Sequence, residues 1–480
     1  MRHLLSSFSW SRSWKPALIA TAMLVTGGLF AAESNAVAPA VTAQAAYDAA
    51  TNAASNAVAL AASSSALANT TWLLVSAALV MLMTPGLAFF YGGMVRKKNV
   101  LGTIMHSFIA LCVISVVWMV LGYSLGFGPD LIKISVAGKD WGFLGNFDWA
   151  FLKGVSFAPD QYYVPTGVPH QAYMIFQMMF AIITPALITG AFAERFKFST
   201  YIVFLVLWSL LVYSPLAHWV WSNNGWLFQY GALDFAGGLV VHMSSGFAAL
   251  AAALLVGKRK GLGQVSMPPA NPAYTILGAA LLWFGWFGFN AGSAIASGAL
   301  ATSAFVATHI ATAAAGLTWM LAEWIHKGKP STLGAASGAV AGLVAITPAA
   351  GFVSPVGALL VGGIGGIVCH YACSFKKLFG FDDSLDVVGV HGFGGAWGAI
   401  ATGIFAGWMV DPSSGITAKG LLAGNPGQLV IQLVSVGVTF VYSFGLTAII
   451  LFILDKTMGL RVNEEDEEKG LDESVHGEAF

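Results

Sequence analysis

Eleven long apolar segments follow one another along this chain, and they constrain its fold more than any other feature. Hydrophobic residues make up 57% of the sequence and charged residues only 9%, whereas ordinary soluble domains carry about 25% charged residues. A helix needs about 20 mainly apolar residues to cross a bilayer. We therefore expect an all-α polytopic membrane protein with eleven transmembrane helices, the eighth of them short and rich in glycine. The segments cover residues 71–95, 99–127, 171–193, 200–221, 235–256, 272–294, 300–326, 334–350, 353–375, 390–410 and 427–454.

Basic residues gather at alternate ends of these segments. Fifteen lysines and arginines follow the odd-numbered segments, against four in the alternate loops. Cytoplasmic loops of membrane proteins are the ones enriched in Lys and Arg. We therefore expect a multi-pass protein of the cell (inner or plasma) membrane with its N-terminus outside and its C-terminus in the cytoplasm. The fifteen are Arg96, Lys97, Lys98, Arg195, Lys197, Lys258, Arg259, Lys260, Lys327, Lys329, Lys376, Lys377, Lys456, Arg461 and Lys469, and the four are Lys133, Lys139, Lys153 and Lys419.

The N-terminus has the pattern of a secretory signal peptide. A basic stretch up to Lys15 precedes an apolar run, from Ala17 to Phe30, that is too short to span a membrane, and Ser34-Asn-Ala36 offers a small-x-small cleavage site. An uncleaved anchor is the alternative. The predicted organisation is a signal peptide over residues 1–36, a mobile extracytoplasmic leader over 37–69, an eleven-helix domain over 70–458 and a cytoplasmic tail over 459–480.

Two of the apolar segments contain a histidine that an aspartate precedes. In the fifth segment Asp234 lies eight residues before His242, and in the tenth Asp386 lies before His391. The carboxylate of Asp234 is predicted to cap its helix, and His242 would lie ~12 Å deeper along it. An ionisable residue at that depth of a membrane is a functional hypothesis by default. Two unrelated core histidines bonded to backbone are the alternative.

The two segments that contain these histidines are the fifth and the tenth of the eleven. This order suggests two five-helix halves followed by a final helix. Since five is odd, the second half would enter the membrane in the opposite sense, which makes the two halves inverted repeats. Sites in such proteins form near mid-membrane, where the repeats meet. His242 and His391 could then face each other.

Several motifs, in order, resemble the ammonium transporter/methylammonium permease/Rh family, in its bacterial ammonium transporter branch. The resemblance covers about residues 70–475. It implies the ammonium-transporter fold, a homotrimer with a pore in each subunit, and ammonium transport for nitrogen uptake. The motifs are Phe90-Tyr-Gly-Gly-Met-Val-Arg96, Gly190-Ala-Phe-Ala-Glu-Arg195, Asp234-Phe-Ala-Gly-Gly followed by His242, Trp286-Phe-Gly-Phe-Asn-Ala-Gly-Ser293, and Asp382-Asp-Ser-Leu-Asp-Val-Val-Gly-Val-His391.

The resemblance also implies residues for the transport pathway. An outer site for ammonium would consist of Trp221, Ser293 and Phe180, and Phe180 with Phe289 would form a gate below it. Aromatic ring faces attract small cations, and a serine oxygen can accept a hydrogen bond from an N–H group.

The twin histidines imply how the substrate crosses. Ammonium would lose its proton near the outer site, ammonia would cross an apolar pore lined by His242 and His391, and the proton would follow along the two imidazoles. Neutral imidazole has one donor and one acceptor nitrogen, so two rings can share and pass a proton. Asp234 would support the outer mouth by bonding to backbone amides, with direct contact to the cation as the alternative. Asp386 would have the same part in the other half.

The tail from Gly459 is acidic, and acidic tails are usually solvated and disordered. Its end resembles the regulatory tail of bacterial members, which implies a PII-type nitrogen-regulatory protein as a partner. An ammonium sensor and an enzyme are the competing interpretations. No P-loop or zinc motif is present, and a net charge of zero argues against nucleic acid as a partner. We therefore expect a transporter that is not an enzyme, with no cofactor and no metal site.

Overall fold

A computed structural model describes residues 43–136, 138–160 and 166–480. The predicted signal peptide lies outside the described residues. The described part of the predicted leader is helical, because helix α2 covers Ala43–Met94 without a break. Alanine is the strongest helix former, and the Ala-rich sequence of this stretch explains why the first helix begins well before residue 71. The chain divides into two units at Ala61 and Ala62, and residues 62–480 contain the helical bundle.

Four short 3₁₀ turns of the described residues lie in, or at the edge of, the loops between the predicted segments: η1 (Lys97–Asn99), η3 (Ala150–Leu152), η8 (Pro412–Ser414) and η9 (Leu421–Ala423). The remaining helical elements of the described residues lie mostly within the predicted segments. They are α3 (Val100–Val117), η2 (Trp118–Gly122), α4 (Tyr123–Phe127), α5 (His170–Phe192), α6 (Phe198–Trp208), η4 (Ser209–Tyr213), α7 (Ser214–Trp221), α8 (Trp226–Tyr230), η5 (Gly238–Met243), α9 (Ser244–Val256), α10 (Pro272–Ala291), η6 (Gly292–Ala294), α11 (Ala299–Lys327), α12 (Thr332–Ile346), α13 (Pro355–Ala372), α14 (Phe375–Phe379), η7 (Val388–Phe393), α15 (Gly394–Phe405), α16 (Pro426–Thr457), α17 (Glu464–Lys469) and α18 (Leu471–His476).

Nine helices among the described residues are long and apolar enough to cross a membrane. The eighth predicted segment is the shorter apolar helix α12, and the tenth consists of η7 and α15 in succession. All eleven predicted segments are therefore helical, and the predicted fold class, a polytopic helical membrane protein, is confirmed.

Side-chain caps mark where three of the helices begin. Asn271 accepts hydrogen bonds from the first turn of α10, and Ser331 and Ser354 do the same for α12 and α13. A proline follows the cap of α10 and of α13, where its missing N–H costs nothing. These caps satisfy N–H groups that a helix start would otherwise leave without partners.

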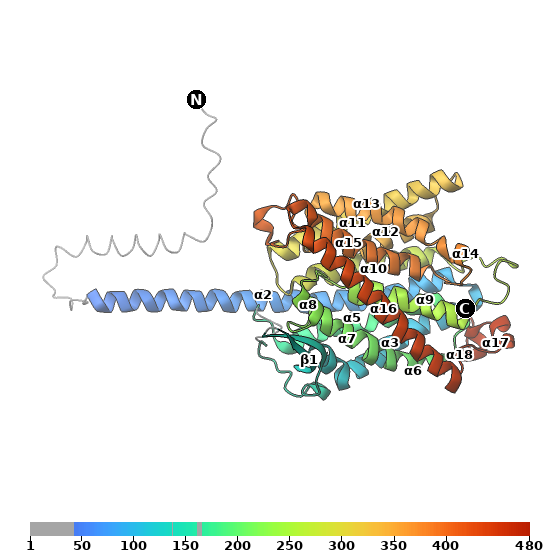
Figure 1. The fold of residues 1–480 in the computed structure, drawn as a ribbon, viewed down its shortest axis with the longest axis horizontal. Helices are drawn as coiled ribbons and strands as arrows, with labels where there is room; N and C mark the ends of the chain where they lie inside the picture. The colour runs from blue at the N-terminus through green and yellow to red at the C-terminus, as the bar shows by residue number, and fades with distance from the viewer. Residues whose placement is uncertain (1–42, 137, 161–165) are drawn as a thin grey trace, which may run out of the picture. The chain divides into compact units, whose positions relative to one another are not determined.

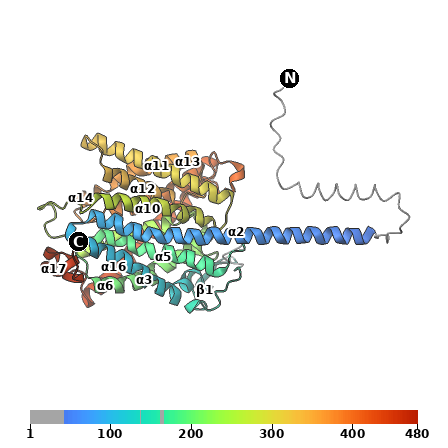
Figure 2. The ribbon, with the colours of Figure 1, turned by 180° about the vertical axis from the view of Figure 1, so that it is seen from behind.

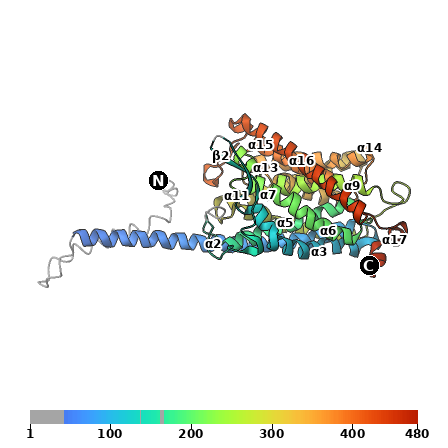
Figure 3. The same cartoon turned by 60° about the horizontal axis from the view of Figure 1, so that its bottom comes forward.

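The helices of residues 62–480 run side by side, and α16 crosses obliquely over α9 (Figure 1). Helices α11, α12 and α13 pack against one another on one side of this bundle (Figure 2). The β-hairpin lies at one end of the bundle, and α14 and α17 lie at the other (Figure 3). Helix α8 lies at the same end as the hairpin (Figure 1). We call the two ends the hairpin end and the tail end.

The hairpin is an element that the sequence analysis did not predict. Strands β1 (Asp130–Val136) and β2 (Lys139–Gly145) pair antiparallel. Apolar side chains of β1, including Ile132 and Ile134, are exposed. The hairpin occupies a loop between two helices, so it adds to the helical fold without changing its topology.

The two histidine helices pass each other in opposite directions. Gly246 in α9 lies against the backbone of Gly392, and Gly395 in α15 lies against the carbonyl of Gly238. A higher number on one helix thus pairs with a lower number on the other, as inverted repeats require. A side chain at Gly246 or Gly395 would collide with backbone of the other helix, and small residues allow membrane helices to approach this closely.

Both histidines lie in π-helical turns. The N–H groups of Val241 and His242 both donate to the carbonyl of Gly237, at 2.9 and 3.0 Å, so the turn η5 holds one extra residue. His391 lies in the corresponding π-helical turn η7. Single π turns inside helices occur frequently at functional sites.

Candidate functional site

A cavity of about 410 Å³ opens near the hairpin end, and the three residues of the predicted ammonium site line it. Trp221, Ser293 and Phe180 come from α7, η6 and α5. Gln177 and Tyr173, one and two turns before Phe180 on α5, also line this cavity. These two residues were not predicted from the sequence, although their spacing from Phe180 on one helix face is a signal that could indicate them. We call this space the aromatic cavity.

Trp221 is held at the wall of the aromatic cavity by two contacts. Its indole nitrogen donates to the backbone carbonyl of Asp234 at 3.0 Å. Its ring meets the ring of Phe180 edge to face, with 5.9 Å between centroids. The indole face is therefore fixed in position before any ligand arrives.

Ser293 has its hydroxyl proton already in use. Its Oγ donates to the backbone carbonyl of Phe289 at 2.8 Å. A hydroxyl has one donor and two acceptor lone pairs, so the oxygen of Ser293 is available as an acceptor. This arrangement suits a ligand that carries N–H groups.

Two phenylalanine rings close the floor of the aromatic cavity. Phe180 and Phe289 have ring centroids 4.3 Å apart and are almost completely buried. Phe180 lines the aromatic cavity, whereas Phe289 lines a second cavity beyond it. The ring pair thus separates the two spaces, which is the position expected of the predicted gate.

The second cavity has a volume of about 10 Å³ and contains both histidines. This is about the space that one water molecule needs. Its other lining residues are apolar or aromatic, and we call it the histidine cavity. The Nδ1 atoms of His242 and His391 are 3.2 Å apart, within hydrogen-bonding distance. The predicted pairing of the two histidines is therefore present in the geometry.

His242 has further contacts that the sequence analysis did not anticipate. Its ring stacks near Trp286 and Phe289, with centroids 5.4 and 5.9 Å away. Its Nε2 atom is 3.3 Å from the hydroxyl oxygen of Thr347, the residue that ends α12. A single threonine in an apolar segment gives no sequence signal, so only the three-dimensional arrangement identifies it.

Asp234 caps the helix of His242, as the sequence analysis predicted. Its two carboxylate oxygens accept from the N–H groups of Gly237, Gly238, Leu239 and Val240, at 2.6–3.2 Å. Burial raises the pKa of Asp234, while these four donors favour its charged form. The carboxylate also lines the aromatic cavity and adds negative potential there.

The corresponding prediction for Asp386 is wrong. Asp383, three residues earlier, accepts from the N–H of Val388 at 2.8 Å and so caps the helix of His391. Asp386 instead forms an ion pair with Lys376 at 2.7 Å and is partly exposed. The reason lies in the backbone: Asp386 has a φ of +61°, which directs the chain away from an ordinary capping turn.

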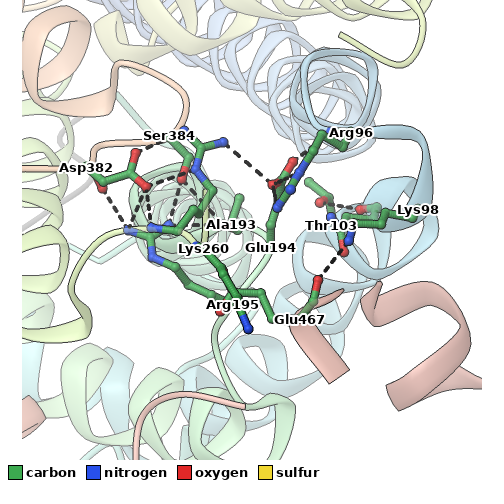
Figure 4. A network of polar contacts seen from close by, with 12 residues as sticks. Arg96, Lys98, Thr103, Ala193, Glu194, Arg195, Lys260, Asp382, Ser384 and Glu467 are labelled. Atoms are coloured by element: carbon green, nitrogen blue, oxygen red, sulfur yellow. Dashed lines mark hydrogen bonds and ion pairs between the residues drawn. The ribbon is translucent and has the colours of Figure 1, made fainter. Parts of the chain in front are cut away.

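A network of buried charges joins the loops at the tail end (Figure 4). Glu194 is fully buried and binds Arg96 at 2.6 Å. Asp382 pairs with Arg259 at 2.9 Å. Arg195 donates to the carbonyls of Ala191, Ala193, Gly257 and Asp382 and to the hydroxyl of Ser384. Glu194 and Arg195 therefore fix the loops at this end of the bundle.

The acidic tail is folded onto the tail end of the bundle, whereas acidic tails are usually solvated and disordered. Glu467 is buried and accepts from the backbone N–H of Lys260 and from Arg461. Asp472 accepts from the N–H groups of Leu101 and Gly102. The sign of the charge explains the difference, since the tail docks where basic residues and helix N-termini gather.

Among the described residues, no group of three or more His, Cys, Asp or Glu side chains could hold a metal ion. Cys369 and Cys373 are free thiols in this part of the chain; Cys369 is buried and Cys373 is partly buried.

Comparison with known proteins agrees with this architecture. Residues 71–480 match the model of the Ammonium Transporter Family. The ammonium transporter of Bacillus subtilis (strain 168) is 50% identical over 411 residues, which cover 85% of this chain and 97% of the relative. Ammonium transporter Amt1 of Archaeoglobus fulgidus is 48% identical over 410 residues, covering 85% of this chain and 98% of that protein.

Solved structures show the same similarity. The crystal structure of Saccharomyces cerevisiae Mep2 superposes with a TM-score of 0.76 at 36% identity, over 83% of this chain and 88% of that one. A structure described as Sensor Amt Protein superposes with a TM-score of 0.75 at 31% identity, over 86% of this chain and 98% of that one.

Proposed function

The chain belongs to the ammonium transporter family, and from this premise we propose that it carries ammonium across a membrane through a pore within each subunit. The observation that carries the proposal is the order of the parts along one path. The aromatic cavity comes first, the ring pair of Phe180 and Phe289 follows, and the two histidines lie beyond it. Moving a cation through an apolar barrier requires recruitment, passage past a gate and transfer of a proton, and each part serves one of these steps.

Recruitment takes place in the aromatic cavity. Ammonium lies against the ring face of Trp221 and near Phe180, and donates a hydrogen bond to Ser293. The attraction of a cation to an aromatic face is worth about 0.5–2 kcal/mol, more where water is excluded. The buried carboxylate of Asp234 adds favourable potential, although its oxygens are occupied by backbone N–H groups.

Beyond the rings, the substrate moves as ammonia. A charge at mid-membrane costs at least about 2.5–3.5 kcal/mol, and the histidine cavity has few polar groups to replace lost water. Ammonium therefore leaves its proton before the rings, ammonia crosses, and the proton follows along His242 and His391. Potassium and sodium ions have no proton to give up and are excluded.

The setting of the pore extends the proposal. The chain spans the cell membrane several times, with its N-terminus outside after removal of a signal peptide and its C-terminus in the cytoplasm. Three copies assemble into a homotrimer. The folded tail and the basic loops of the tail end form the cytoplasmic face, where a PII-type nitrogen-regulatory protein binds.

A second candidate function is ammonium sensing. It is favoured by the similarity to the structure described as Sensor Amt Protein. A sensor would bind ammonium in the aromatic cavity and carry no sustained flux.

Purified full-length protein in liposomes on a solid-supported membrane distinguishes the two. An ammonium pulse should produce a transient current in the transporter, and a potassium pulse of equal concentration should produce none. Protein that binds ammonium, as followed by the fluorescence of its tryptophans, but gives no current and no uptake of ammonium would overturn transport and favour sensing.

A further inference from the structure

Thr347 lies between His242 and the indole of Trp286, with its side chain fully buried. Its Oγ is 3.3 Å from Nε2 of His242 and 2.9 Å from the indole nitrogen of Trp286. We propose that Thr347 sets the tautomers of the histidine pair, and so decides which ring nitrogen is free to accept a proton. The mechanistic meaning of this choice rests on the proposed function, whereas the tautomers themselves do not.

The hydroxyl of Thr347 has all of its bonding positions assigned. Its proton goes to the carbonyl of Leu343 at 2.7 Å. That carbonyl lacks its usual helical donor, because the N–H of Thr347 bonds to Val344 instead. One oxygen lone pair accepts from Trp286, since an indole nitrogen is a donor only. The remaining lone pair faces His242, so Nε2 of His242 must carry a proton.

The tautomer of His391 follows from that of His242. A neutral imidazole with a proton on Nε2 has a bare Nδ1. The 3.2 Å contact between the two Nδ1 atoms is then a hydrogen bond in which Nδ1 of His391 donates. Nε2 of His391 is left bare, and it has no protein partner within the described part of the chain. The pair at rest therefore has its free acceptor on His391.

The resting tautomers of His242 and His391 are those that remain after a proton has passed from His242 to His391. For transfer that starts at the aromatic cavity, a proton adds to Nε2 of His242, the proton on Nδ1 of His242 passes to Nδ1 of His391, and the proton on Nε2 of His391 leaves. His242 then has its proton on Nε2 and His391 on Nδ1. Thr347 stabilises this product, and the return to the starting tautomers has to break the Thr347 bond.

A purely structural role for Thr347 predicts an effect on stability and none on the histidine tautomers. In that case Thr347 would only end α12 and accept the hydrogen bond from the indole N–H of Trp286. Removing its hydroxyl would then change the stability of the protein and leave the histidine tautomers as they were. Thr347→Val preserves the shape of the side chain and removes the hydroxyl. Thr347→Ser restores the hydroxyl, and Thr312→Val is a matched control, because the buried hydroxyl of Thr312 bonds to Thr308 on α11.

The test is solid-state NMR of full-length protein in liposomes, labelled with ¹⁵N-histidine and ¹⁵N-tryptophan. The pair is identified by the coupling between its two Nδ1 atoms, and His242 by its contact with the indole of Trp286. We expect one set of signals in the wild type, with protons on Nε2 of His242 and Nδ1 of His391. The reverse pattern should appear as a second set in Thr347→Val and be absent from Thr347→Ser and Thr312→Val.

An unchanged single set in Thr347→Val, or a bare Nε2 on His242 in the wild type, would overturn the proposal. Ammonium current is measured on the same preparations. A wild type with the expected tautomers and no current would contradict the proposed transport while leaving the role of Thr347 in place.

Discussion

Trp221 donates its indole N–H to the backbone carbonyl of Asp234, with 3.0 Å between the two atoms. The carboxylate of the same aspartate holds the first N–H groups of the helix that contains His242. One residue thus connects the wall of the aromatic cavity to the start of a histidine helix. The geometry of the aromatic cavity and the position of His242 are therefore coupled.

The histidine pair provides the most direct test of the mechanism. His242→Ala and His391→Ala should each abolish ammonium current or let potassium through a hydrated lumen, because one imidazole has no partner to pass a proton to. His391→Glu should retain part of the current, since a carboxyl group also donates and accepts a proton. The measurement is ammonium against potassium current, normalised to folded protein. Wild-type current and selectivity in both alanine variants would exclude the relay.

Ser293 should affect recruitment. A hydrogen bond to a charged group is worth about 1.5–3 kcal/mol, so Ser293→Ala should raise the half-saturating ammonium concentration about tenfold or more. Trp221→Leu, which removes the ring face, should raise it several-fold. Ser297→Ala is a matched control, because Ser297 lies just beyond η6, bonds to Asn69 and does not line the aromatic cavity. An unchanged half-saturating concentration for Ser293→Ala would remove the residue from the site.

Phe180 can be compared with Phe176, its neighbour one turn away. Both rings are buried, with centroids 4.9 Å apart, and either alanine variant should lose about 3–5 kcal/mol of stability. Of these two rings, only Phe180 belongs to the pair with Phe289 that separates the two cavities. Phe180→Ala should therefore alter maximal current or admit potassium, whereas Phe176→Ala should lower stability alone. Equal selectivity in the two variants would argue against a gate.

Asp383 should make stability depend on pH. Burial raises its pKa from 3.8 to about 6, so the folded protein binds a proton that the unfolded chain releases between these values. The stability that this adds is fully present below pH 4 and is lost as pH rises through about 6, by ~3 kcal/mol. Asp383→Asn keeps an acceptor for Val388 and should remove this dependence. The readout is the thermal midpoint in detergent from pH 4 to 7.

Asp382 is the matched control for that experiment. Burial acts to raise its pKa, but the ion pairs with Arg259 and Arg195 outweigh burial and hold the pKa below its usual value. Its contribution to stability is present above pH 4 and is lost only as pH falls further. Asp382→Asn should therefore lower the midpoint by a constant amount between pH 5 and 7. The same slope in all three proteins would contradict the assignment to Asp383.

Two adjacent glutamates test the docking of the tail. Glu467 is buried and pairs with Arg461, whereas Glu468 is largely exposed and pairs with Lys260 at the surface. Breaking a buried ion pair costs about 3–5 kcal/mol, and a surface pair is worth about 0–1 kcal/mol. Glu467→Gln should release the tail, which trypsin would then cut at Lys469. Glu468→Gln should remain as resistant as the wild type, and equal cutting of both variants would contradict a docked tail.

The sequence predicts the helices well because each apolar run must be helical inside a bilayer. The repeat order also allows His242 and His391 to face each other, and in the structure their Nδ1 atoms are 3.2 Å apart. Capping is less predictable: Asp383 and Asp386 lie in the same motif, and only the backbone turn decides which carboxylate reaches Val388. The hairpin and the docked tail depend on contacts between distant segments, such as Glu467 with Lys260, and such contacts leave no local pattern.

The π-helical turns make chain length within the histidine helices as important as residue identity. Each residue of a helix turns the chain by about 100°, and the turn around Gly237 holds one more residue than a regular α-helix would. Deleting a residue between Asp234 and His242 would leave both present and aim the imidazole at a different neighbour. When homologues are compared, a one-residue gap in these two turns should therefore be weighted like the loss of a histidine.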